Sequence, residues 1–143
     1  MNWRVIANYT ILLFLARFLV GFLDGLLSAP ATDPQTALWH YAIGNLASFL
    51  MGAAIFALLV IRLANRPCQH AAFVLLAYVA ISLPFDRVVA IWLPTHYPSV
   101  LAAIDWLVLL ISFLSGTFIG QIFRRRCPVA ASRTEASASQ ADA

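Results

Sequence analysis

Four long apolar runs, separated by short polar connections, dominate the pattern of the chain. The runs cover residues 5–27, 37–61, 71–93 and 100–123. Each run is longer than the roughly 20 residues that a helix needs to cross about 30 Å of hydrocarbon. Strands of a membrane barrel would be shorter and would alternate in polarity, which these runs do not. Lipid offers no partners for backbone N–H and C=O groups, so the four runs are predicted to be helices.

Composition indicates the environment in which such a chain folds. Hydrophobic residues make up 62% of the 143 residues and charged residues only 10%, whereas a soluble domain carries about 45–50% apolar and about 25% charged residues. The predicted fold is therefore an all-α, four-helix transmembrane bundle with short loops, in one domain over residues 1–127. Residues 128–143 are rich in Ala and Ser without apolar periodicity, and we expect a disordered cytoplasmic tail there.

The positions of the arginines predict the orientation. All nine basic residues of the chain are Arg. Outside the apolar runs, Arg4 precedes the first run, and Arg62 and Arg66 lie in the second connection. The others follow the fourth run: Arg124, Arg125, Arg126 and Arg133. The first and third connections contain no Lys or Arg. Because basic residues favour the cytoplasmic side, both termini are predicted to be cytoplasmic, in an integral protein of a bacterial inner (plasma) membrane.

A signal peptide is the alternative for the first run. The segment Ala29-Pro30-Ala31 has the form of a signal-peptidase site, and cleavage there would leave three spans. The run before it is longer than the roughly 7–15 apolar residues of a signal peptide, and it contains Arg17 and Asp24. We therefore expect the first run to remain as a span.

Ionisable side chains lie inside the apolar runs, although a charge at the bilayer centre costs roughly 2.5–3.5 kcal/mol. At about 1.5 Å per residue along a helix, these side chains and one amide are expected to converge in the outer half of the bundle. We take them as candidate binding residues, with contributions from every run: Arg17, Asp24, Asn45, Asp86, Arg87 and Asp105.

Charge balance among these residues leaves two readings open. Arg17 is expected to pair with Asp24 or Asp105. Arg87 is expected to pair with Asp86 or Asp105, so that one carboxyl group lacks a full partner. A carboxyl group of this kind tends to take up a proton in an apolar medium, which would suit proton coupling or the binding of a cation or polar ligand. A structural network of ion pairs that fixes helix register is the preferred reading.

Small residues recur at helical spacing and predict close helix packing. The pairs Gly21–Gly25 and Gly116–Gly120 have GxxxG spacing, and Gly44-Ser48-Gly52 forms a similar ladder. Such residues let helix backbones approach closely in lipid, so these stripes are expected to face one another. Pro84 interrupts the third run and predicts a kink there.

The inner ends of the runs carry features that suggest partners. Arg124, Arg125 and Arg126 are expected to attract anionic lipid head groups. Cys68 and Cys127 flank inner helix ends and are expected to be free thiols in a reducing cytosol. A basic run without interleaved aromatic residues does not indicate nucleic-acid binding.

The pattern predicts no catalytic residues, no metal site and no cofactor. Small drug exporters share the size and the four spans, but they share an early membrane-embedded Glu, and this chain has no Glu before Glu135. The leading hypothesis is an accessory, assembly or protective interaction subunit, with a membrane-protein partner or a second copy. The alternative is a small transporter or channel-like protein for a polar or ionic solute, with proton coupling through an intramembrane Asp as one form of it.

Overall fold

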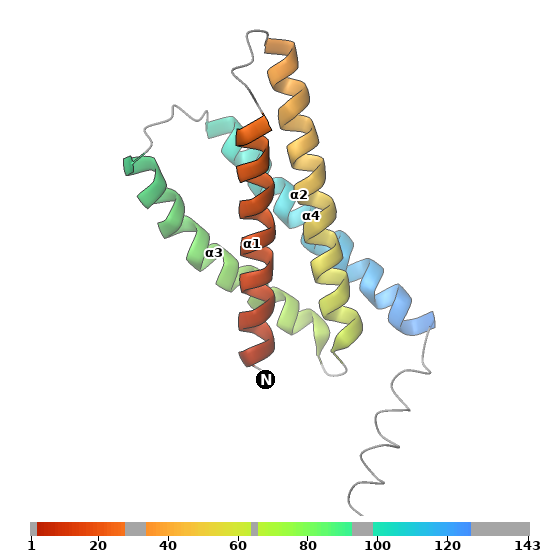
Figure 1. Cartoon of the computed structure of the whole chain (residues 1–143). Coiled ribbons are helices and arrows are strands. Elements are labelled where there is room, and N and C mark those ends of the chain that lie inside the picture. The colour runs from red at the N-terminus through yellow and green to blue at the C-terminus, as the bar shows by residue number, and fades with distance from the viewer. Residues whose placement is uncertain (1–2, 28–33, 64–65, 93–98, 127–143) are drawn as a thin grey trace, which may run out of the picture.

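The computed structural model describes residues 3–27, 34–63, 66–92 and 99–126, all but two of which belong to helices. The helices are α1 (Trp3–Leu27), α2 (Pro34–Arg62), α3 (Pro67–Trp92) and α4 (Ser99–Arg126), as Figure 1 shows. Each of the four is long and apolar enough to cross a membrane. The prediction of an all-α fold with four helices long and apolar enough to span a membrane is therefore confirmed for the described residues. The proposed cytoplasmic tail, the Ala29-Pro30-Ala31 segment and Cys127 lie outside the described residues.

Each helix begins slightly before the apolar run that predicted it, and α2 and α4 also end beyond theirs. Helix α2 begins at Pro34 and α3 at Pro67. Proline is favoured at a first helical position because its missing N–H would find no partner there. Between α2 and α3, Arg66 adopts a left-handed conformation with φ of 48°, and its carbonyl oxygen accepts hydrogen bonds from the backbone N–H groups of Gln69 and His70. Helix α3 runs unbroken through Pro84.

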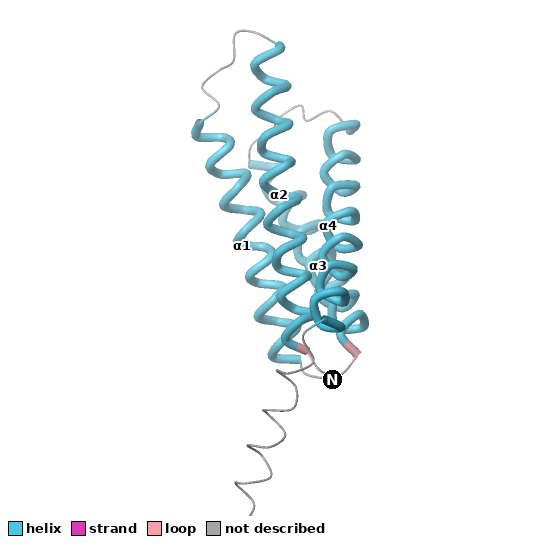
Figure 2. The backbone as a smooth tube through the Cα atoms, turned by 90° about the vertical axis from the view of Figure 1, so that its right-hand side faces the viewer, coloured by secondary structure: helices cyan, strands magenta, loops and turns pink. Residues whose placement is uncertain are grey.

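Helices α2 and α4 form the most extensive interface of the bundle. Figure 1 shows α4 crossing behind α2, and Figure 2 gives a second view of the bundle. At Gly116 an added Cβ would come within 2.4 Å of the carbonyl oxygen of Ala53. At Gly120 it would come within 2.7 Å of Cβ of Val60. Glycine at these positions therefore lets the two backbones approach, as the small-residue pattern of α4 predicted.

The same prediction is wrong for α1. An added Cβ at Gly21 or Gly25 would meet nothing within 4 Å, so these glycines pack against no helix. The reason is that α1 turns another face toward the bundle, on which Leu13 and Ala16 are buried. Gly21 instead lines a cavity between α1 and α3.

An apolar core fills the half of the bundle that holds the N-termini of α1 and α3. Its buried members come from every helix: Ile6, Leu13, Ala16, Ile55, Phe56, Leu59, Ala71, Val74, Tyr78 and Leu109. Toward its C-terminal end, α3 diverges from α1 (Figure 1). Every side chain of the segment 83–89 is exposed within the chain. This divergence leaves the other half of the bundle open.

Candidate binding site

A partly open cavity of about 360 Å³ lies among the four helices, between the C-terminal halves of α1 and α3. Charged, polar and aromatic side chains line it together. We call it the charged cavity and define it by its lining residues: Phe14, Arg17, Phe18, Gly21, Phe22, Ser48, Tyr78, Ser82, Phe85, Asp86 and Asp105.

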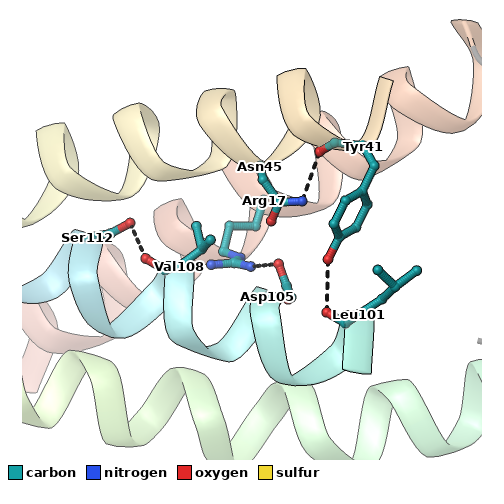
Figure 3. Close-up of polar contacts among 7 residues, drawn as sticks. All are labelled: Arg17, Tyr41, Asn45, Leu101, Asp105, Val108 and Ser112. Carbon is teal, nitrogen blue, oxygen red and sulfur yellow. Dashed lines mark hydrogen bonds and ion pairs between the residues drawn. The ribbon is translucent and has the colours of Figure 1, made fainter. Parts of the chain in front are cut away.

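An ion pair crosses the bundle at this cavity. Nη2 of Arg17 on α1 donates a hydrogen bond to Oδ1 of Asp105 on α4, as Figure 3 shows. The Arg17 side chain is 8% exposed and that of Asp105 is 48% exposed. The guanidinium carbon of Arg17 also lies 5.8 Å from the centre of the Tyr78 ring, within the range of a cation–π contact. Arg17 therefore contacts both α3, through Tyr78, and α4, through Asp105.

Arg17 retains a donor that the described residues do not satisfy. Its Nη1 atom is buried and has no hydrogen-bond partner among them. A buried donor left without an acceptor costs roughly 1–3 kcal/mol, and more when it belongs to a charged group. An acceptor from water or from a bound solute would remove this cost.

Asp86 supplies a second carboxylate to the lining. Its side chain is exposed, and no ion pair joins it to another residue in the described part of the chain. The expected pairing of Arg87 with Asp86 or Asp105 is wrong, because Arg87 is exposed and does not line the cavity. With Arg17 and Asp105 already paired, the charge of Asp86 is left over.

Asn45 and Asp24 lie outside the lining. The Nδ2 atom of Asn45 donates to the carbonyl oxygen of Tyr41 at 2.8 Å, within the same helix (Figure 3). The Asp24 carboxyl group lies against α2, where an added Cβ at Gly44 would stand 3.3 Å from its Cγ. Among the six predicted residues, the structure brings Arg17, Asp86 and Asp105 together and leaves Asn45, Asp24 and Arg87 apart.

An aromatic wall, which was not among the residues predicted from the sequence, completes the cavity. Phe14, Phe18 and Phe22 follow one another along α1 with nearly parallel rings, at interplanar angles of 10° and 12°. Phe85 of α3 stands edge-on to Phe14, with ring centres 5.3 Å apart. The spacing of four residues in α1, and of Tyr78, Ser82 and Phe85 in α3, places each set on one helix face. That spacing is the signal that could have identified them.

The arrangement is suited to binding. Within the described ranges, no three His, Cys, Asp or Glu side chains gather closely enough to hold a metal ion. The lining offers one fixed cation, two carboxylates, hydroxyl groups and aromatic surface. Comparisons of the chain with protein families, curated proteins and solved structures found no match.

Proposed function

We propose that this small membrane protein takes a polar or ionic solute into the charged cavity, in the manner of a small transporter. The observation that carries the proposal is the convergence of Arg17, Asp86 and Asp105 on one partly open cavity at membrane depth. Charged side chains in membrane spans usually face a partner or a water-filled space that a substrate can enter. The unsatisfied Nη1 donor of Arg17 supports a cavity that admits water or a polar group.

The two halves of the bundle differ in a way that supports entry from one side. One half contains the apolar core, in which Phe56, Leu59 and Val74 are fully buried. The other half contains the cavity and the diverging end of α3. A solute would therefore enter from the cavity side and stop at Arg17. Passage across the membrane would require α3 to move relative to α1, since the core closes the path in this conformation.

We assign the cavity to the periplasmic side of a bacterial inner membrane. The assignment rests on Arg4, Arg62 and the run from Arg124 to Arg126, all of which lie at the opposite ends of the helices. Basic residues favour the cytoplasmic side. Both termini would then be cytoplasmic, and anionic lipid head groups would contact the arginines at the end of α4.

Cysteine labelling tests whether the cavity admits water-soluble molecules. Ser82 lines the cavity and is only 5% exposed. We would introduce S82C into a C68S/C127S background and treat right-side-out vesicles with small membrane-impermeant methanethiosulfonate reagents. Labelling is expected, because the reagents can reach Ser82 only through the open cavity. S112C is the matched control, since Ser112 is fully buried where α4 meets Gly52 of α2.

The two variants give a clear decision. Labelling of S82C but not of S112C supports a solute-accessible cavity. Equal resistance of both cysteines to the reagents would refute the proposed function, because it would show that the cavity is closed to polar molecules. Labelling from inverted vesicles alone would contradict the assigned side.

An accessory, assembly or protective interaction subunit is the second candidate. The observation that favours it is the outer part of α3, where Leu83, Arg87 and Ile91 are all exposed within the chain. A membrane-protein partner or a second copy would cover this face. Labelling of I91C would then be slower in native membranes than in nanodiscs that hold the purified chain. Equal rates in the two preparations would count against a partner at this face.

A further inference from the structure

We infer that the charged cavity selects a hydrophobic organic cation with a single positive charge. This inference rests on the proposed solute-binding role of the cavity and names the class of solute. Three properties of the lining carry it: the sign of its net charge, its aromatic wall and the open space at Gly21.

The charge of the lining is the first property. The lining contains one Arg and two Asp residues, which gives a formal charge of −1. Arg17 and Asp105 neutralise each other in their ion pair, so Asp86 supplies the remaining negative charge. Inside a cleft with apolar walls, water screens a charge less than it does at an open surface. The cavity therefore attracts a cation and disfavours an anion.

The aromatic wall is the second property. Four phenylalanines line the cavity, namely Phe14, Phe18, Phe22 and Phe85. Aromatic rings bury apolar surface well, and their faces attract cations that have lost water. A small hydrated metal ion would gain little from such a wall. An organic cation with alkyl or aryl groups would gain from both the wall and Asp86.

The available space is the third property. Pockets for small organic molecules have volumes of about 300–1,000 Å³, and the charged cavity has about 360 Å³. Part of this space exists because Gly21 has no side chain, and an added Cβ there would touch nothing within 4 Å. A larger residue at Gly21 would occupy the cavity without forcing the helices apart.

Two ions of the same shape and opposite charge test the inference. Tetraphenylphosphonium is a hydrophobic monocation, and tetraphenylborate is an anion of nearly equal size. The intact chain would be placed in nanodiscs of neutral phosphatidylcholine, and binding of each ion would be measured by equilibrium dialysis, with empty nanodiscs as the baseline. We expect saturable binding of tetraphenylphosphonium at one ion per chain, without competition from tetraphenylborate.

Substitutions test whether tetraphenylphosphonium binds in the charged cavity. D86N is expected to weaken tetraphenylphosphonium binding at least tenfold, and D86E to retain it. G21L is expected to abolish binding, whereas G25L should leave it unchanged, because Gly25 is equally open but does not line the cavity. R87Q changes a charge next to Asp86 outside the lining, so it should also leave binding unchanged.

The outcomes separate this inference from the function on which it rests. If tetraphenylborate bound saturably and G21L blocked that binding, the cavity would not select cations. The proposed solute-binding function would still hold. If D86N bound tetraphenylphosphonium as well as the unmodified chain does, the inference would be wrong but the proposed function would remain. The same conclusion would follow if S82C were labelled and the chain showed no saturable binding of tetraphenylphosphonium. Failure of S82C to react would remove the proposed function and this inference together.

Discussion

Arg17 and Asp105 form an ion pair between α1 and α4, two helices whose Cα atoms nowhere come within 8 Å of each other in the described part of the chain. The two residues are 88 positions apart in the sequence. Helices α1 and α4 each pack against α2 and α3, so the pair spans the space that these neighbours leave. The ion pair thus links the two helices directly where backbone packing does not.

Breaking this pair should be more harmful from the Asp105 side than from the Arg17 side. D105N leaves the guanidinium of Arg17 buried without its carboxylate and should cost about 2–3 kcal/mol, less than the roughly 3–5 kcal/mol for a fully buried pair. R17Q leaves the half-exposed Asp105 without its partner and should lower the free energy of unfolding by about 1–2 kcal/mol. Thermal unfolding in detergent, followed by circular dichroism, measures both.

The double variant R17Q/D105N provides the control for that prediction. It removes both charges and should be more stable than the sum of the single effects implies, because neither charge remains unpaired. Strictly additive losses would show that the two side chains do not interact. Equal losses from D105N and R17Q would contradict the difference in burial between them.

Alanine at two glycines should have opposite effects on stability. G116A should destabilise the bundle by about 1–3 kcal/mol, because the new Cβ would collide with the backbone of Ala53. G21A should be neutral or stabilise by up to about 1 kcal/mol, because its Cβ enters open space and alanine favours a helix. Unfolding midpoints of the two variants in one detergent provide the test. A loss of stability from G21A would mean that α1 packs through its glycines after all.

Removing the hydroxyl group of Tyr41 should loosen the contact between α2 and the start of α4. Its Oη atom donates to the carbonyl oxygen of Leu101 at 2.9 Å, and a hydrogen bond of this kind contributes about 0.5–1.5 kcal/mol. Y41F should therefore lower the free energy of unfolding by that amount. Y9F is a suitable control, because no hydrogen bond of the Tyr9 hydroxyl joins it to the described residues. Equal effects of Y41F and Y9F would argue against the interhelical bond.

The side of the membrane that Cys68 faces tests the orientation. Cys68 is an exposed thiol at the start of α3, and Nε2 of Gln121 lies 2.9 Å from its Sγ. In a C127S background, a membrane-impermeant maleimide should label it in inverted vesicles and not in right-side-out vesicles. The exposed Gln35, at the opposite end of the bundle, offers the matched control as Q35C in a C68S/C127S background. Labelling of Cys68 from the outside would reverse the assigned topology.

The candidate site was only partly predictable from the sequence. Charge inside an apolar run identified Arg17, Asp86 and Asp105, because a charge in lipid is costly wherever the helix packs. The same reasoning selected Asn45, Asp24 and Arg87, which the structure leaves outside the cavity. Depth along a helix follows from residue number, but the direction of a side chain around the bundle depends on how each helix is rotated against its neighbours.

The helices themselves were determined by the sequence alone. Each apolar run is long enough to cross lipid, and a backbone in lipid must satisfy its hydrogen bonds within its own segment. Local composition therefore sufficed to predict α1, α2, α3 and α4 with boundaries within a few residues of those observed.

Only the tertiary structure decided which surfaces of these helices meet. GxxxG spacing occurs in both α1 and α4, yet Gly116 packs against α2 while Gly21 faces the cavity. Arg17 had two acidic candidates at suitable depth, and it pairs with Asp105 because Asp24 lies against Gly44 of α2. In lipid, helices associate through close packing and polar contacts, and these depend on the fit of whole surfaces, which sequence spacing alone does not specify.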